Sequence, residues 1–278
     1  MDAQKRRPTD PSYDKSSIHI PDEAWTQLSS SMIQYWRMKQ HHYDKIFFFR
    51  LGKFYEIFYD DAVLCNKILD LHWMSKDKKL HTGFPEKKLN KYVGLLVDKG
   101  YTVAIVESTE TSREALARNI EQKQNLTSQG ILEMSLEEKL DQKQGLVTNR
   151  VIQNIFTKGT FANTEKDSYE PQYVMSISLS SIEDKNNIGV CYFDISTFKC
   201  HLGSFEDNSL FITLRTTITK IRPVEIIYET GQINKELEQI LKNLPMQPVL
   251  NLIPADKAKS IQRCQNAIDK YLYNAEDE

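Results

Sequence analysis

The run KIFFFRL, residues 45–51, most constrains the fold, because it sets four large apolar side chains in succession. A short continuous apolar run of this kind is typical of a buried strand. The segments around it have the spacing of helices and further strands. We predict helices over residues 22–40, 59–71, 87–100 and 112–124, and strands over residues 101–107 and 154–161. We therefore expect a mixed sheet with flanking helices, of the α/β (α+β) class.

The second half of the chain has a different pattern, which begins after the polar stretch ANTEKDSYEPQ, residues 162–172. Short β-rich runs separated by turn residues predict a three-stranded meander over residues 173–180, 187–196 and 199–205. A helix, a strand and a second helix are then predicted over residues 208–221, 223–229 and 234–244. This order of elements predicts a second, smaller α/β domain.

The domain organisation follows from these changes in pattern. Residues 1–20 are polar and lack periodicity, so we expect them to be disordered. The first domain is predicted at residues 21–161, the linker at 162–172, the second domain at 173–254 and a helical tail at 255–278. The polar stretch at residues 125–145 is interpreted as a surface insertion.

Composition excludes several classes of protein. The formal net charge is -2, so basic regions have to be found locally rather than over the whole chain. The four cysteines form no CxxC pair, which argues against a zinc site and a disulfide framework. No apolar run approaches the roughly 20 residues of a membrane span, and the N-terminus lacks the apolar core of a secretory signal. These features favour a reducing, intracellular compartment.

The sequence does not favour an enzyme. It contains no GxxxxGK[ST], GxGxxG, GxSxG or HExxH motif. The pair Asp60-Asp61 could bind a divalent metal, but neighbouring helical residues point about 100° apart and do not easily share one ion. The pair is therefore interpreted as a solvated first turn of a helix. A two-metal nuclease needs converging carboxylates, and Asp194, Glu225 and Glu229 are the nearby strand-borne choices. Their interpretation as solvated strand ends is strongly favoured, so a nuclease is the weakest alternative.

The stretch GKFYEIF, residues 52–58, has an unusual arrangement of aromatic and acidic residues. If it is a strand, Phe54 and Glu56 lie on one face and Tyr55 on the other. An aromatic ring on such a face can unstack a base step, while a carboxylate meets the edge of a base. In the simpler interpretation Phe54 belongs to the core and Glu56 to the surface. The pattern alone favours that simpler interpretation.

A basic stretch at residues 72–91 points toward nucleic acid. Trp73, Met74 and Phe84 lie among its lysines, and only Asp77 and Glu86 oppose them. We interpret it as a basic loop whose cations hold phosphates while an apolar group presses on sugars or bases; a merely solvated loop is the alternative. The phosphate-binding candidates are Lys76, Lys78, Lys79, Lys87, Lys88 and Lys91.

Four motifs in order carry a resemblance to a known family. GKFYEIFYDDA, HTGFPE, LVDKGYTVAIVESTET and IFTKGT resemble the MutS mismatch-recognition family, most of all the large subunit of its eukaryotic MutS-alpha type. The resemblance runs from about Trp25 to about Leu244 and implies a mismatch-binding domain followed by a ribonuclease-H-like connector. It further implies that Phe54 stacks at a mismatch, that Glu56 contacts the displaced base, and that Lys53 and Met74 touch DNA beside it.

The resemblance also implies partners and a location. The expected ligand is double-stranded DNA with mismatches or small loops, and the expected protein partners are the other MutS-alpha subunit and repair factors that bind the connector. A nuclear location is expected. No cofactor is expected, because ATP and magnesium belong to the family's ATPase domain, whose P-loop this sequence lacks. The alternative function is a protein-interaction adaptor of the repair complex that does not recognise DNA itself.

Overall fold

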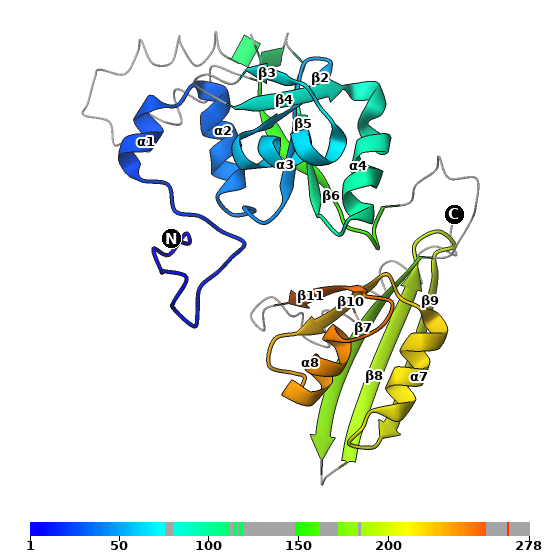
Figure 1. Cartoon of the computed structure of the whole chain (residues 1–278). Helices are drawn as coiled ribbons and strands as arrows, with labels where there is room; N and C mark the ends of the chain where they lie inside the picture. Colours follow the sequence, from blue (N-terminus) through cyan, green and yellow to red (C-terminus); the bar gives the residue numbers. More distant parts are fainter. Residues whose placement is uncertain are drawn as a thin grey trace. The chain divides into compact units, whose positions relative to one another are not determined.

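The computed structural model describes residues 1–75, 80–111, 114–115, 117–118, 148–161, 172–182, 185–253 and 266. The chain divides into two compact units, Met1–Thr157 and Lys158–Glu278. Each unit has its own sheet (Figure 1). Each unit also has its own cluster of buried apolar side chains. The expected α+β class is confirmed, because both sheets are mixed and both carry helices.

The first unit is built on a six-stranded sheet in the order β3-β4-β2-β1-β5-β6. The predicted buried strand is β1, which pairs antiparallel with β2 and parallel with β5. The strands are β1 (Ile46–Leu51), β2 (Phe54–Phe58), β3 (Trp73–Ser75), β4 (His81–Pro85), β5 (Val103–Ser108) and β6 (Arg150–Phe156).

Helices cover both faces of this sheet. On one face, Tyr35 of α2 packs against the rings of Phe47, Phe49 and Phe58. On the other, a chain of ring contacts links Phe48 through Phe84 to Tyr92 of α4. The alternation of side chains along β1 therefore gives each face its own aromatic layer. The helices are α1 (Asp22–Gln27), α2 (Ser30–Lys39), α3 (Tyr59–Leu69), α4 (Leu89–Asp98) and a 3-10 turn (Glu86–Lys88).

A buried ion pair joins three elements of the first unit. Lys39 at the end of α2 donates to both carboxylate oxygens of Asp61 in α3, at 2.9 and 2.7 Å. Asp61 also accepts a hydrogen bond of 2.9 Å from the backbone N–H of Phe47 in β1. Burial raises the pKa of this carboxyl, and Lys39 opposes the shift. The prediction that Asp61 is a solvated helix residue is therefore wrong.

The second unit is built on a five-stranded sheet in the order β11-β10-β7-β8-β9. The predicted meander is present as three antiparallel strands, and β10 pairs parallel with both β7 and β11. Helices α7 (Ile212–Ile221) and α8 (Lys235–Lys242) pack on one face of the sheet, around Leu214, Ile218 and Leu237. The strands are β7 (Tyr173–Ile182), β8 (Lys185–Asp194), β9 (Lys199–Asp207), β10 (Glu225–Glu229) and β11 (Val249–Ile253).

Several elements differ from the sequence predictions. The single helix expected over residues 22–40 is two helices, α1 and α2. The expected basic loop at residues 72–91 instead contains β3 and β4, and it ends inside α4. The strand β11 was not predicted. The predicted helix at residues 112–124, the insertion at 125–145 and the tail at 255–278 lie outside the described residues, apart from isolated positions.

The division between the units falls between Thr157 and Lys158, before the predicted linker at residues 162–172. The reason is a contact that sequence spacing does not reveal. The backbone N–H of Gly159 donates to Glu225 of β10 at 3.1 Å, and a side chain at Gly159 would meet Val174 at 2.3 Å. The motif IFTKGT thus ends one unit and begins the other.

The N-terminal segment, expected to be disordered, contains neither helix nor strand but is held by hydrogen bonds. The Asp2 carboxylate accepts from the backbone N–H groups of Arg6 and Asp14, at 2.8 and 3.0 Å. The backbone N–H of Ile18 donates to the carbonyl of Gln40. One carboxylate that accepts several backbone hydrogen bonds can hold a polar segment in place. Such a segment has no apolar periodicity, which is the signal from which helices and strands are predicted.

No helix among the described residues has the length and apolar character needed to cross a membrane.

Candidate nucleic-acid interface

Phe54 lies at the tip of a β-hairpin. The two residues Gly52 and Lys53 connect β1 to β2, and Gly52 has φ 62° at the first of these positions. A positive φ there is what a type II′ hairpin turn requires, and glycine meets it without strain. Phe54 is therefore the first residue of β2, with 43% of its surface exposed. The simpler interpretation of Phe54 as a core residue is wrong, although Tyr55 beside it is 2% exposed.

Strand register places Phe54 and Glu56 on one face of the sheet. Phe54 pairs with Leu51, and Glu56 pairs with Phe49. Phe49 packs against α2, so the face of Phe54 and Glu56 is the face that α2 covers further along the strands. Tyr55 points to the other face, against Phe84 at 5.7 Å between ring centroids. The predicted alternation of these side chains is confirmed.

Met74 lies beside Glu56 because of a glycine. Gly83 of β4 pairs with Glu56, and a side chain at Gly83 would meet the Met74 sulfur at 3.1 Å. The missing side chain leaves room for the Met74 thioether, which is 50% exposed. The Glu56 side chain is 19% exposed, with Oε2 3.9 Å from Nε2 of His81. Sequence reasoning missed Gly83, although a glycine within a strand often marks such a close approach.

A charged network holds the tip of the hairpin on the opposite face. Arg50 pairs with Glu86 and, at 3.1 Å, with Glu107, and the Tyr55 hydroxyl donates to the same Glu107. Burial raises the pKa of the Tyr55 hydroxyl, and the Glu107 carboxylate raises it further. The backbone N–H of Glu86 donates to the carbonyl of Lys53 at 3.0 Å. The tip that carries Phe54 is therefore anchored to β5 and to the 3-10 turn that follows β4.

Exposed lysines lie in the hairpin turn and in the segment that follows β4. Lys53 lies in the turn itself, and Lys87 and Lys88 follow Pro85, which pairs directly with Phe54. Lys91 is also exposed, with Nζ 5.8 Å from the Tyr92 ring. Lys76, Lys78 and Lys79 lie outside the described residues. The structure thus brings Lys53, Phe54, Glu56 and Met74 together, with additional cations alongside.

Asp194 and Glu225, two of the carboxylates considered for a nuclease, are 2% and 3% exposed, so their interpretation as solvated strand ends is wrong. Asp194 accepts hydrogen bonds from Ser196 and Thr197 in the turn after β8. Glu225 accepts from Gly159 and from Asn251. In the described part of the chain, no cluster of three or more His, Cys, Asp or Glu residues could hold a metal ion. The arrangement favours stabilisation of the second unit over two-metal chemistry.

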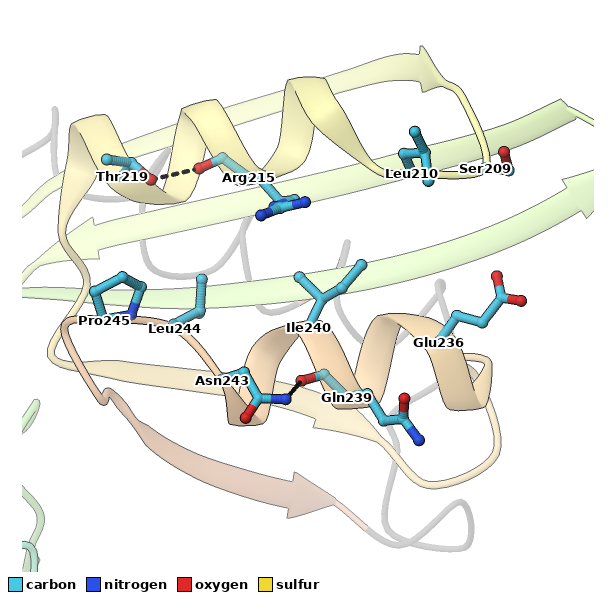
Figure 2. Close-up of a pocket in the computed structure, with 10 residues that line it drawn as sticks. All are labelled: Ser209, Leu210, Arg215, Thr219, Glu236, Gln239, Ile240, Asn243, Leu244 and Pro245. Atoms are coloured by element: carbon cyan, nitrogen blue, oxygen red, sulfur yellow. Dashed lines mark hydrogen bonds between the residues drawn. The ribbon is translucent and has the colours of Figure 1, made fainter.

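The second unit has an open groove between α7 and α8. Its volume is about 640 Å³, and Figure 2 shows Arg215 of α7 and Ile240 of α8 pointing into it. Leu210 lies at one end and is 63% exposed. The groove combines apolar side chains with one cation, Arg215, one acid, Glu236, and several uncharged polar groups, a mixture that protein-contact surfaces also have.

Comparison with known proteins matches both units to one family. A family model described as MutS domain I matches residues 29–165, and a model described as MutS domain II matches residues 172–269. The chain is 33% identical over 261 residues to the DNA mismatch repair protein MSH6 of Arabidopsis thaliana, covering 91% of this chain and 18% of that protein. It is 32% identical to human Msh6, covering 87% and 17%.

A bacterial relative and a solved structure complete the comparison. The DNA mismatch repair protein MutS of Staphylococcus carnosus is 28% identical, with 77% of this chain and 21% of that protein covered. The Holliday junction resolvase of fowlpox virus aligns with 36% of this chain and 74% of its own, at 11% identity and a TM-score of 0.23, which is too low to support an argument. The chain spans about a fifth of the length of the curated relatives it matches. It belongs to the MutS family of DNA mismatch repair proteins and carries the family's domains I and II.

Proposed function

We propose that the first unit binds mispaired duplex DNA through the tip of the β1–β2 hairpin. The observation that carries the proposal is the exposure of Phe54 at that tip, on the face that also presents Glu56 and Met74. An exposed ring on a rigid hairpin can wedge between base pairs and kink the duplex. A matched duplex resists this deformation, whereas a mispaired step is already weakened. Kinking the mismatched duplex therefore costs less free energy, and the protein binds it more tightly.

The test is a binding assay with duplexes that differ only at one base pair. The 278-residue chain is titrated into a G·T-mismatched duplex and its matched counterpart at one stated salt concentration. Tighter binding of the mismatched duplex supports the proposal. Equal affinity for the two duplexes contradicts recognition, and the absence of any binding favours the adaptor alternative.

Glu56 is proposed to contact the displaced base. Its partly covered carboxylate lies near phosphates in any DNA complex, so it needs a base N–H donor or a shared proton to offset the repulsion. We expect Glu56→Ala to reduce discrimination while affinity for the matched duplex holds or rises, because a negative charge is lost. Glu206→Ala, an acid on β9 of the second unit, is the control and should leave both affinities unchanged. A fall in matched-duplex affinity for Glu56→Ala would contradict this role.

Lysines at the hairpin tip are proposed to hold the phosphates. Binding should weaken as salt rises, with a log–log slope of about -0.9 for each phosphate contact. Replacing both Lys87 and Lys88 by glutamine is expected to reduce the magnitude of that slope by about 2 and to lower affinity equally for matched and mismatched DNA. Lys235→Gln, an exposed lysine of the second unit, should leave the slope unchanged. If the DNA affinity of the parent protein stays the same as the salt concentration rises, the assignment of these lysines as phosphate contacts is wrong.

The remaining parts of the proposal concern the chain as a whole. We infer a non-catalytic role for these two domains, without bound ATP or magnesium, because the sequence has no phosphate-cradling P-loop. Nucleotide turnover that disappears on mutation of this chain would refute that inference. We also propose a nuclear location and assembly with the other MutS-alpha subunit, supported by the similarity to eukaryotic MSH6 proteins.

A protein-interaction adaptor is the second candidate function, and the groove between α7 and α8 favours it. The proposed occupant is the other MutS-alpha subunit or a repair factor that presents an apolar side chain to Ile240 and an acid to Arg215. Arg215→Glu should then weaken that protein complex without changing DNA affinity. Binding of the other subunit that is insensitive to Arg215→Glu would count against this surface.

A further inference from the structure

Two cysteines of the second unit lie within reach of each other. Cys191 of β8 and Cys200 of β9 have their sulfur atoms 3.7 Å apart. Cys191 pairs with Leu202 and Cys200 with Phe193, so the two cysteines are diagonal neighbours on one face of the sheet. Neither the proposed DNA contacts nor the groove between the helices involves them.

The surroundings of the pair leave it open to small molecules. Tyr192 and Ile188 of β8 pack toward α7 and α8, so Cys191 points to the opposite face. There it lines a shallow depression of about 440 Å³, with Ser176 and Gly189. Cys200 is exposed, whereas Cys65 of the first unit is completely buried. A dissolved oxidant therefore reaches Cys200 directly.

The position of β9 permits the strands to adjust. A disulfide needs a sulfur–sulfur distance of about 2.05 Å, and diagonal cross-strand neighbours start further apart than directly paired residues. Closing the sulfur–sulfur gap from 3.7 Å requires the backbone of β9 to move along β8. β9 is the edge strand and pairs with β8 alone among the described strands, so such a shift disrupts no second ladder. A bond formed in this way is strained and hence readily reduced.

We propose that Cys191 and Cys200 form a reversible redox site that hydrogen peroxide closes to an intramolecular disulfide. The exposed Cys200 thiolate attacks one peroxide oxygen; the O–O bond breaks, and the products are a sulfenic acid and water. The Cys191 sulfur then attacks the sulfenic sulfur, the S–S bond forms, and the oxygen leaves as a second water. Two thiols are oxidised and one peroxide is reduced.

The order of attack follows from the surroundings of each thiol. Burial raises the pKa of Cys191 to about 11, and the contact with Cys200 adds to the shift. A thiol with a raised pKa supplies little thiolate, which is the attacking species. Cys200 is the more exposed of the two thiols, so it reacts with peroxide, and Cys191 resolves the sulfenic acid. This order predicts a different trapped product for each single variant.

The experiment uses the full reduced chain, treated with equimolar hydrogen peroxide and then blocked with N-ethylmaleimide. Peptide mass spectrometry should find a disulfide between Cys191 and Cys200, with the loss of two hydrogens. Dithiothreitol should reduce this disulfide. Cys191→Ser should accumulate a sulfenic acid at Cys200 that dimedone traps, while Cys200→Ser should leave Cys191 reduced. Cys65, buried in α3, is the internal control and should stay unlabelled unless the protein unfolds.

Three results would overturn the proposal: both thiols still free after peroxide, Cys200 joined to Cys264 or to a second chain, or Cys200 over-oxidised while Cys191 stays reduced. Thermal melting of both serine variants checks that each remains folded. If either unfolds early, the same mass measurement on the parent protein still decides, since it requires no substitution. DNA affinity of the parent is measured in parallel, so a failure of the proposed DNA function is distinguishable from a failure of the redox site.

Discussion

Phe54→Ala is expected to abolish the preference for a mismatched duplex while leaving affinity for the matched duplex almost unchanged. The substitution removes the ring that wedges between bases but none of the lysines that hold phosphates. Stacking of one aromatic side chain on a base contributes about 1–3 kcal/mol, which corresponds to about a 5- to 150-fold loss of affinity for mismatched DNA. The measurement is the ratio of the two dissociation constants at one salt concentration.

Two control variants separate the wedge from a structural effect. Phe198→Ala removes a ring that is 80% exposed in the second unit and should leave the ratio unchanged. Phe58→Ala removes a fully buried ring from the same strand as Phe54 and should cost about 3–5 kcal/mol of stability. Phe54→Ala should melt close to the parent protein. If it melts as early as Phe58→Ala, the ring serves packing; if it melts like the parent and still prefers the mismatch, the wedge assignment fails.

Local patterns predicted the strand β1 and, on the condition that residues 52–58 form a strand, the two faces of β2, although the pattern alone favoured Phe54 as a core residue. The apolar run of β1, the glycine after it and the alternation in β2 together place Phe54 and Glu56 on one side. The meander, α7, α8 and β10 also follow from short-range periodicity. Each of these features depends on residues that are close in the sequence, and for this reason they could be predicted.

The parts that could not be predicted depend on contacts between distant residues. β3 and β4 lie in a lysine-rich stretch, and lysine is depleted in strands, so the pattern favoured a loop. Met74 lies beside Glu56 because Gly83 has no side chain to occupy that space. This effect arises only when β2, β3 and β4 are paired in the sheet. The partners of Arg50 are likewise distant, at positions 86 and 107. Charge spacing along the chain contains no signal for such pairs.

Lys39 and Asp61 are the clearest case of a structural ion pair that local sequence patterns do not indicate. They are 22 positions apart, and each on its own looks like a surface residue. In the fold their side chains are 3% and 11% exposed, and they tie α2, α3 and β1 together. Since β1 leads directly into the hairpin that carries Phe54, this ion pair supports the strand on which the proposed DNA contact is built.

Lys39→Met is therefore expected to destabilise the first unit by about 3–5 kcal/mol at pH 7, because it leaves the Asp61 carboxylate buried without its cation. Lys45→Met is the matched control: it breaks a more exposed pair with Asp44, at 2.8 Å, and should cost about 0–1 kcal/mol. Chemical denaturation of the three proteins measures both differences.

The pH dependence of Lys39→Met distinguishes a stranded charge from a simple packing defect. Burial already raises the pKa of Asp61, and removal of Lys39 takes away the group that opposes this shift. A carboxyl whose folded pKa lies above its unfolded value, about 3.9, binds protons more readily in the folded state. Stability of the variant should therefore be favoured at low pH and fall as pH rises through the raised pKa. The gap between Lys39→Met and the parent should narrow from pH 7 toward pH 4; a gap that stays constant would show that lost packing, not the unpaired carboxylate, causes the destabilisation.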